Sequence, residues 1–391
     1  MKKKIVILGS TGSIGKNLVD ILKKKINEFE ITLLTANKNY KLLFKQSKLL
    51  NVKNLIITDE KSFIKATKIN KNKNIHIFNN FKNFNKIFKK KIDYSMCAIS
   101  GINGLEPILD IIKHTKVIAI ANKEAIICGW SLINDKLKKT KTKFIPVDSE
   151  HYSIWFALKN TNLKNVEKIY ITASGGPFLN LPKAKFKDIK ISDALKHPNW
   201  KMGKKISVDS ATMMNKTFEI IEAKNIFNLP YEKLSVLVHK ASYIHAIIKF
   251  NTGLIKIVAH DTTMQIPIFN TLYENHDNFL KTSQINIQKL NNLELHKVDS
   301  SKFPIQKILK RMPKNTSLFE TILVSANDFL VEHFLKNKIK FIDINKLLFK
   351  IINLKEFKKY KTLKVKNLKE IIILNNYVRL KLEKYVYKIT I

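Results

Sequence analysis

The first fifteen residues place the strongest constraint on the fold of this chain. A short apolar run at residues 5–8 leads into the segment GSTGSIG at residues 9–15, and an amphipathic helical pattern follows. A buried strand, a glycine-rich turn and a helix form the usual context of a dinucleotide-binding turn, in which the helix N-terminus receives the pyrophosphate. The glycines are spaced G-x-x-G-x-x-G rather than G-x-G-x-x-G, so a plain tight turn is the alternative. The strand–turn–helix context favours nucleotide binding.

Further apolar, β-branched runs alternate with helical patterns over the next 130 residues. We expect strands at residues 31–34, 55–58, 75–78, 94–99, 117–121 and 144–147. Such alternation is typical of a parallel sheet covered by helices on both faces. The sequence therefore predicts an α/β fold that starts with a Rossmann-like, doubly wound domain over residues 1–147.

The end of the second expected strand bears on the choice of nucleotide. An NAD site usually has an acidic residue there, which binds the ribose 2′-hydroxyl. This chain has instead Asn37, Lys38 and Asn39. A lysine with two amides favours the 2′-phosphate of NADP. The alternative for Lys38 is one more surface lysine in a lysine-rich chain.

The composition limits the class of protein. The chain has 391 residues and a net charge of +40, from 71 basic and 31 acidic residues. Only Arg311 and Arg379 are arginines, and the lysines are spread along the chain, so we do not expect a specific nucleic-acid site. Cys97 and Cys128 give no disulfide framework, which fits a reducing compartment. No apolar run reaches the length of a membrane span, and a cytoplasmic enzyme without a membrane partner is expected.

Asp148 and Glu150 follow the apolar run 144–147. If the strand continued, residues i and i+2 would point the same way, and the two carboxylates would converge at its end while Ser149 faced the opposite side. Converging carboxylates repel each other unless a cation or a shared proton relieves them. The motif therefore indicates a site for a hard divalent metal ion. A solvated loop is the alternative for an isolated D-x-E motif.

The segment after residue 168 is rich in groups that bind anions. Small residues at 173–176 follow an expected strand and suit an anion-binding loop, and the segment 197–203 has the composition of a lid. Ser210, Asn215 and Lys216 are donors that suit a phosphate monoester. Glu219 lies three and four residues beyond Lys216 and Asn215, so we expect all three near one another on a helix, with Glu219 as a third metal ligand.

Several motifs together resemble the 1-deoxy-D-xylulose 5-phosphate reductoisomerase family. The matching blocks, in order, are GSTGSIG (9–15), ANKE (121–124), PVDSEH (146–151), SGGPF (174–178), HPNWKMGKKISVDSATMMNK (197–216) and Glu219. This resemblance implies an NADPH-dependent oxidoreductase of isoprenoid precursor biosynthesis, which also needs Mg²⁺ or Mn²⁺. The implied reaction rearranges the ketose phosphate through carbon–carbon cleavage and re-formation, and NADPH then reduces the branched aldehyde to 2-C-methyl-D-erythritol 4-phosphate.

The resemblance also implies a role for each matching residue. The metal ligands would be Asp148, Glu150 and Glu219, which with Lys123 form the catalytic set. The substrate would be bound by Lys123, Ser149, Glu150, Ser174, His197, Trp200, Ser210, Asn215, Lys216 and Glu219. The NADPH would be bound by Thr11, Gly12, Ser13, Ile14, Asn37, Lys38, Asn39, Asn122, Glu124 and Gly203. The family usually has glycine where this chain has Asn37, and asparagine tolerates a positive φ.

The family organisation implies further domains and a homodimer. We expect a central α+β catalytic and dimerisation domain at residues 148–273, a linker at 274–300 and a small helical domain at 301–391. Two family patterns are altered here: the block His239–Lys240–Ala241–Ser242 and the stretch Val324–Ser325–Ala326–Asn327–Asp328. The first alteration puts the assembly rather than the chemistry in doubt.

Two other classes of protein remain as alternatives. A metal-dependent phosphatase with a vestigial nucleotide fold would explain the carboxylates and the phosphate donors but not the first 40 residues. A polyanion-binding protein without enzymatic activity would explain the net charge. Consumption of NADPH that depends on a metal ion and on a ketose phosphate separates the reductoisomerase from both.

Overall fold

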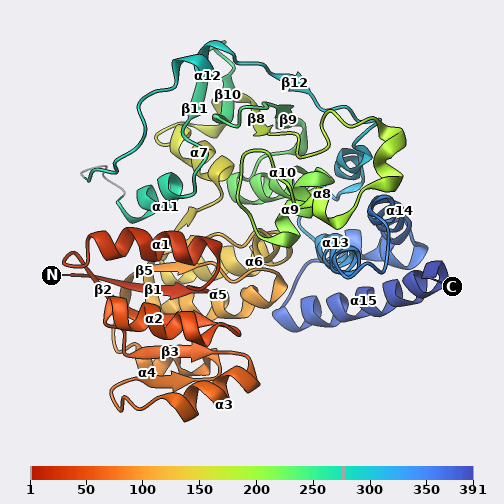
Figure 1. Ribbon diagram of the computed structural model, residues 1–391. Coiled ribbons are helices and arrows are strands. Elements are labelled where there is room, and N and C mark those ends of the chain that lie inside the picture. Colours follow the sequence, from red (N-terminus) through yellow and green to blue (C-terminus); the bar gives the residue numbers. More distant parts are fainter. Residues whose placement is uncertain (1, 274–277, 391) are drawn as a thin grey trace. The chain divides into compact units, whose positions relative to one another are not determined.

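The computed structural model describes residues 2–273 and 278–390 (Figure 1). The chain divides into two compact units. The first comprises residues 1–125, 132–152 and 263–281, and the second comprises residues 126–131, 153–262 and 282–391. Residues 274–277, at the start of the predicted linker, lie outside the described residues. The four-part division predicted from the sequence stays a prediction about domain boundaries.

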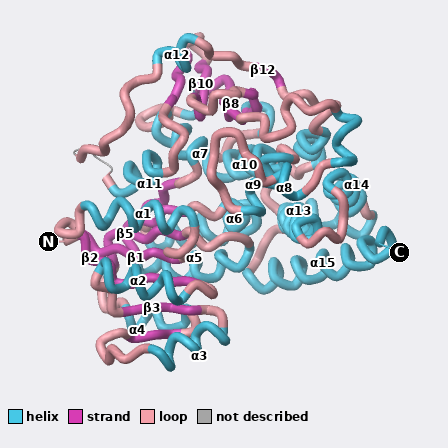
Figure 2. The backbone as a smooth tube through the Cα atoms, viewed as in Figure 1, coloured by secondary structure: helices cyan, strands magenta, loops and turns pink. Residues whose placement is uncertain are grey.

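The first unit is built on a parallel sheet of seven strands, several of which are labelled in Figure 2. They are β1 (Lys3–Leu8), β2 (Phe29–Ala36), β3 (Asn54–Ile57), β4 (His76–Phe78), β5 (Ile92–Cys97), β6 (Thr115–Ile120) and β7 (Lys143–Pro146). Their order is β4-β3-β2-β1-β5-β6-β7, so the strand order reverses between β1 and β5. In doubly wound sheets a ligand binds at the carboxyl ends of the strands at such a reversal.

Helices connect the strands of the first unit: α1 (Ser13–Lys24), α2 (Tyr40–Leu50), α3 (Glu60–Ile69), α4 (Phe84–Ile87), α5 (Leu105–Ile111) and α6 (Lys123–Thr140). The chain returns to this unit late, with α11 (Gln265–Leu272). Helix α11 contacts α1, and its residues Ile268, Phe269 and Leu272 belong to the same buried core as Ile5 and Ile7. Burial of these apolar side chains is the main contribution to the stability of the unit.

The second unit contains a mixed sheet of five strands in the order β11-β10-β8-β9-β12. These are β8 (Val166–Ala173), β9 (Leu234–Val238), β10 (Ile244–Phe250), β11 (Ile255–Ala259) and β12 (His296–Lys297). Its helices are α8 (Ile191–Ala194), α9 (Lys204–Ala211), α10 (Met214–Phe227), α12 (Ile287–Asn291), α13 (Phe319–Leu335), α14 (Phe341–Ile352) and α15 (Leu368–Thr390). Helix α7 (Ser149–Ala157) runs from the first unit into the second. The predicted α/β class with a helical C-terminal region is confirmed.

On a continued strand Ser149 would face away from Asp148 and Glu150, so the substrate contact that the resemblance implies for Ser149 requires the backbone to leave strand geometry here. The structure agrees, because β7 ends at Pro146 and α7 begins at Ser149. The backbone therefore leaves strand geometry at the point where the two carboxylates follow each other.

Among the described residues, no helix combines the length and the apolar character needed to cross a membrane.

Candidate active site

The carboxylate of Asp148 lies at the N-terminus of helix α7. Its carbonyl oxygen accepts a bond from the backbone N–H of Tyr152 at 2.8 Å, which begins the helical pattern. Its side-chain Oδ1 accepts from the backbone N–H of Glu150 at 3.2 Å. Asp148 therefore acts as an N-cap, and the helix dipole stabilises its negative charge.

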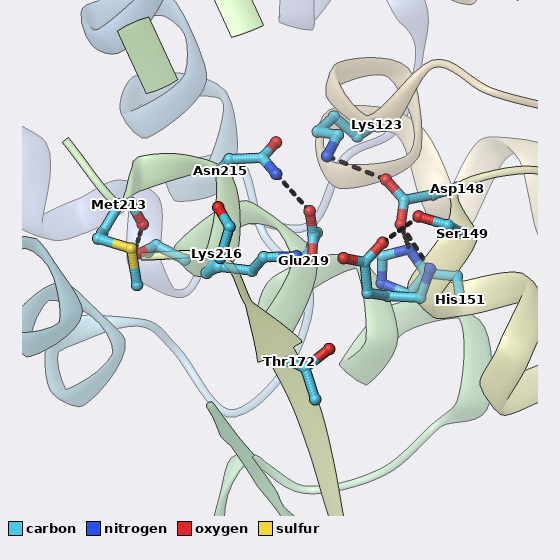
Figure 3. Close-up of polar contacts among 12 residues, drawn as sticks. Lys123, Asp148, Ser149, His151, Thr172, Met213, Asn215, Lys216 and Glu219 are labelled. Carbon is cyan, nitrogen blue, oxygen red and sulfur yellow. Dashed lines mark hydrogen bonds and ion pairs between the residues drawn. The ribbon is translucent and has the colours of Figure 1, made fainter. Parts of the chain in front are cut away.

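Four further side chains of the first unit lie around this carboxylate. The ammonium Nζ of Lys123 is 3.1 Å from Asp148 Oδ2, and Nδ1 of His151 is 3.4 Å from Asp148 Oδ1 (Figure 3). The hydroxyl of Ser149 donates to Glu150 Oε2 at 2.5 Å. Lys123 and Glu150 are both buried. A lysine beside two carboxylates, one buried and one half-buried, offsets part of their repulsion, and the arrangement is suited to bind a cation or an oxyanion.

The third predicted carboxylate lies on helix α10 of the second unit. Glu219 is almost completely buried, and Lys216 Nζ donates to its Oε2 at 2.7 Å. The side-chain amide of Asn215 donates to its other oxygen (Figure 3). The helix places these residues together because they are three and four positions apart. The expected proximity of the three side chains is therefore confirmed.

His197 and Ser174 form the second polar group of this unit. Imidazole Nδ1 of His197 accepts from the backbone N–H groups of Asn199 at 3.1 Å and Trp200 at 2.9 Å. The ring proton must then be on Nε2, which lies 3.0 Å from the hydroxyl oxygen of Ser174. That oxygen also accepts from the backbone N–H of Gly176 at 3.2 Å. Since Ser174 accepts two bonds, its own proton is directed to a further acceptor, such as a phosphate oxygen.

The loop that carries Ser174 packs directly on the end of helix α9. Gly176 has φ of 68°, and a Cβ at this position would lie 2.7 Å from the carbonyl oxygen of Ser210. Only glycine allows this close approach. A pocket of about 610 Å³ opens beside Ser174 and Gly176 and is lined further by Phe178 and Pro198. The second unit therefore gathers three of the predicted substrate-binding elements, namely the loop after β8, the end of α9 and the segment from His197.

The glycine-rich turn of the first unit has the features of a nucleotide site. Gly12 is the N-cap of α1 and has no side chain to occupy the free N–H groups of the helix, and Gly12 and Ser13 are exposed. A Cβ on Gly15 would lie 2.4 Å from the carbonyl oxygen of Gly9, so a glycine is required where the helix packs on the turn. Anions bind at such helix ends.

The three residues after β2 differ in what their side chains do. Lys38 is exposed. Asn39 accepts from the backbone N–H of Leu42 at 3.2 Å and caps helix α2. The amide of Asn37 donates to the hydroxyl of Thr58 at 2.9 Å, and Asn37 is not among the residues with positive φ. The replacement of glycine by Asn37 therefore needs no left-handed backbone.

Comparison with known proteins assigns the chain. Family models described as 1-deoxy-D-xylulose 5-phosphate reductoisomerase and its C-terminal domains match residues 5–129, 144–227 and 261–381. A protein of that name from Pelagibacter ubique is 62% identical over 97% of this chain and 98% of the relative. One from Wolbachia pipientis wMel is 41% identical over 88% of both chains.

The chain belongs to the 1-deoxy-D-xylulose 5-phosphate reductoisomerase family. The Zymomonas mobilis enzyme, solved with NADPH, superposes with a TM-score of 0.89 at 30% identity over 99% of both chains. A second relative, solved with NADPH, fosmidomycin and magnesium, has a TM-score of 0.90 at 26% identity over 98% of both chains. The predicted family, fold class and enzyme class are confirmed, and the phosphatase and polyanion-binding alternatives are set aside.

The other residues of this chain that are predicted to bind the nucleotide lie at the starts of helices. The side-chain oxygen of Asn122 accepts from Ala125 N–H at 2.9 Å, while its amide donates to the carbonyl oxygens of Ile99 and Gly101. These bonds join the loop after β5 to the start of α6, so Asn122 shapes that edge of the sheet. Glu124 is buried in the first turn of α6, and Gly203 is the N-cap of α9.

Sequence reasoning missed side chains that lie against the predicted lid. The amide of Asn199 donates to the hydroxyl of Ser242 at 2.8 Å and to the carbonyl oxygen of Lys240 at 2.7 Å. The ring of His245 lies 6.2 Å from that of Trp200 and stacks on His260 at 3.7 Å. The altered block 239–242 therefore contacts the lid segment, and its expected part in assembly stays a prediction. The altered motif itself was the signal that could have led to these residues.

Proposed function

We propose that the chain converts 1-deoxy-D-xylulose 5-phosphate into 2-C-methyl-D-erythritol 4-phosphate with NADPH and a divalent cation, through the residues described above. The proposed reaction is supported by the chain's membership of the family. The proposed roles of individual residues are supported by the carboxylates and by the groups that can donate hydrogen bonds to a phosphate. In this reaction a carbon–carbon bond of the ketose phosphate breaks and re-forms at the neighbouring carbon. NADPH then delivers a hydride to the resulting aldehyde.

Asp148, Glu150 and Glu219 are proposed to hold the divalent cation. Three carboxylates form the oxygen-rich donor set that Mg²⁺ or Mn²⁺ prefers, and the burial of Glu150 and Glu219 makes a compensating cation favourable. When bound, the cation supplies polarisation of the carbonyl and stabilisation of negative charge on oxygen. Lys123 adds a positive charge beside Asp148, and the Ser149 hydroxyl can turn from Glu150 to a substrate oxygen.

The phosphate of the substrate is proposed to bind to Ser174, Ser210, Asn215 and Lys216, with His197 orienting Ser174. The role of Ser174 is supported by its hydroxyl oxygen, which already accepts two hydrogen bonds, so that its proton can be donated to the ligand. Since the phosphate is remote from the reacting carbons, its binding energy can fix the substrate and close the segment with Trp200 over it. Closure excludes water from the aldehyde intermediate.

NADPH is proposed to bind at the carboxyl edge of the first sheet. Thr11, Gly12, Ser13 and Ile14 offer backbone and side-chain donors at the start of α1, and the exposed Lys38, with Asn37 and Asn39, offers a charge for the 2′-phosphate. Asn122, Glu124 and Gly203 complete the proposed set of nucleotide contacts. The absence of an acid after β2 supports NADPH over NADH.

A homodimer is proposed as the working assembly. Strand β11 lies at the edge of its sheet, and its side chains Ile255 and Ile257 are 56% and 49% exposed. An apolar edge strand is a ready site for pairing with a second copy. The cytoplasm, inferred from the reduced cysteines, remains the proposed location.

The test of the site uses NADPH consumption measured at 340 nm with and without the ketose phosphate and Mg²⁺. Asp148→Asn and Glu219→Gln should each lower kcat by roughly three orders of magnitude or more, because a lost ligand weakens charge stabilisation in the transition state. Circular dichroism should stay unchanged. Asp93→Asn, which alters a surface carboxylate of the first unit paired with Lys116, is the matched control. Wild-type, metal-dependent turnover in both active-site variants would reject the ligand assignment.

A further inference from the structure

The turn between α9 and α10 carries the proposed phosphate donors and contains an unfavourable backbone conformation. Ser210 lies near the end of α9, while Asn215 and Lys216 open α10. Between them Met213 has φ of 64°, a left-handed conformation that is unfavourable for a residue with a side chain. Such a conformation persists only where surrounding contacts hold it. The contacts that hold this turn therefore determine where the phosphate donors point.

One of these contacts comes from the segment Pro304–Arg311. The amide of Gln306 donates to the carbonyl oxygen of Met213 at 3.3 Å and to the hydroxyl of Thr217 at 3.1 Å. This residue lies about ninety positions beyond the turn in the sequence, within the C-terminal part of the same unit. The turn is thus held from its α10 side by the C-terminal segment.

A stronger contact holds the α9 side of the turn. Asp209, next to Ser210, is only 1% exposed. Its Oδ1 accepts from the side-chain amide of Asn327 at 2.7 Å, and its Oδ2 lies 3.0 Å from Lys205 Nζ. Lys205 also lies 2.9 Å from Asp328, so the middle of α13 holds α9 through two adjacent residues. Charge-assisted bonds between buried groups are among the stronger contacts of a protein.

The loop with Ser174 is held by the same C-terminal helices. Phe178, four residues after Ser174, packs edge-to-face on Phe341 of α14 with ring centroids 5.2 Å apart. Phe186 also contacts Phe341, at 6.1 Å. Aromatic pairs of this kind add to the energy of their burial. Both phosphate-binding elements, the loop after β8 and the end of α9, therefore rest on α13 and α14.

From these contacts we propose that Asp209 and Asn327 are positioning residues for the substrate phosphate. The hydrogen bond between them fixes the end of α9, and with it the orientation of Ser210 and of the turn that leads to Asn215 and Lys216. Asp209 does not itself bind metal or substrate in this scheme, because both of its oxygens are already engaged. The proposal rests on the proposed binding of phosphate by Ser210 and gives the C-terminal helices a role in substrate affinity.

The proposal is tested by exchanging the two groups. Asn327→Asp places two carboxylates against each other, and Asp209→Asn removes the negative charge that Asn327 and Lys205 bind, whereas the double variant D209N/N327D restores one carboxylate and one amide in reversed positions. Each single variant should raise KM for the ketose phosphate, and the inhibition constant of inorganic phosphate, by about 10-fold or more, because small displacements of binding groups are costly. KM for NADPH should stay within about 2-fold, and the double variant should recover most of the loss. If a single variant does not fold, Asn327→Ala carries the same expectation.

Two controls separate the possible results. Ser317→Ala removes a buried bond to Glu320 at the start of α13 and should lower Tm without changing either KM. Ser210→Ala tests the phosphate site itself: if it leaves KM for the ketose phosphate unchanged, the proposed phosphate site is rejected. If Ser210→Ala raises that KM while the Asp209 and Asn327 variants only lower Tm, or if the double variant recovers nothing, the positioning role is rejected.

Discussion

At the scale of single residues, the charge of His197 is controlled by the turn that follows it. Two backbone N–H groups point at Nδ1, so this nitrogen can accept a proton only if both bonds break. Burial and the nearby positive charge of Lys216 act in the same direction and lower the pKa of His197 from 6.5 to about 4. His197 therefore contacts Ser174 as a neutral imidazole with its proton on Nε2.

This predicts how acid affects stability. Because the pKa of His197 is lower in the folded state than in the unfolded state, the unfolded chain takes up the proton first. The stability that the neutral ring contributes is complete above about pH 6.5 and is lost as the pH falls towards 4. Urea unfolding at pH 7.5 and 4.5 should show that His197→Gln loses less stability on acidification than the wild type.

The protonation state of the His197 ring can also be observed directly. Nitrogen-15 chemical shifts of the labelled imidazole should report the Nε2–H tautomer between pH 5.5 and 8, because the folded pKa lies well below this range. A midpoint near 6.5 for His197 in the folded protein would contradict the described hydrogen bonds, whatever the unfolding data give.

At the scale of elements, helix α13 contains a buried carboxyl group with the opposite behaviour. Glu320 is fully buried near the helix start, where the backbone N–H and the hydroxyl of Ser317 donate to its Oε2 at 3.1 and 2.8 Å. Burial raises its pKa from 4.5 to about 7, and these bonds and the charge of Lys224 offset only part of that effect. The folded state therefore favours the protonated acid.

We predict that Glu320→Gln stabilises the protein in a pH-dependent manner. Since the folded pKa of Glu320 is raised, the stability due to the neutral acid is complete below pH 4.5 and is lost as the pH rises through 7. The shift corresponds to about 3 kcal/mol at most, so the variant should gain up to about that free energy of unfolding at pH 8 and little at pH 5. Chemical denaturation at both pH values measures the difference.

A matched control lies on the same helix. Glu332 is bonded to Lys336 and Arg379, which lower its pKa, so its contribution to stability is present at neutral pH and is lost on acidification. Glu332→Gln should therefore destabilise slightly at pH 8. A Glu320→Gln variant that behaves in the same way as Glu332→Gln would mean that burial does not raise the pKa of Glu320 in the native protein.

The elements also show what could be predicted from the sequence. Strands such as β3 and β7 were predicted to within about one residue of their observed bounds because a buried strand is a short apolar run between polar turns. The helix that begins at Ser149 was not predicted, because Asp148 can continue a strand or cap a helix and only the following apolar residues of α7 decide between them. The strand order and the return of α11 to the first unit depend on contacts between distant segments, for which no local pattern exists.

The candidate active site shows the same limit of prediction from sequence. Lys216 and Glu219 could be paired from their spacing on one helix. The bond between Asp209 and Asn327 joins positions 118 residues apart, and Ser242 meets Asn199 across 43 residues. Such pairs become visible only when tertiary structure places them together, because an altered motif can mark one partner but does not tell which distant side chain it contacts.

At the scale of the whole molecule, the edge of the second sheet limits how the chain can exist in solution. Among the strands that the structure describes, β11 pairs only with β10, and Ile255 and Ile257, together with the adjacent Leu254, expose apolar surface there. Native proteins usually protect such an edge with charges, prolines or a covering element. In this chain Lys256 lies between the two isoleucines, but its ammonium group is bonded to the carbonyl oxygen of Ala157. The apolar row is thus left for a partner, which supports the proposed homodimer.

We therefore predict that the double variant I255K/I257K is monomeric. Light scattering coupled to size-exclusion chromatography should give the mass of a dimer for the wild type at about 10 μM and half that mass for the variant, since two opposed charged rows repel each other across the interface. Ile373→Lys, which adds a charge at an exposed isoleucine of α15, is the control and should leave the dimer intact. A monomeric wild type, or a variant that stays dimeric, would show that β11 is not the interface. Because both isoleucines are exposed in a single chain, the variant monomer should retain its thermal stability, so a lost dimer could not be attributed to unfolding.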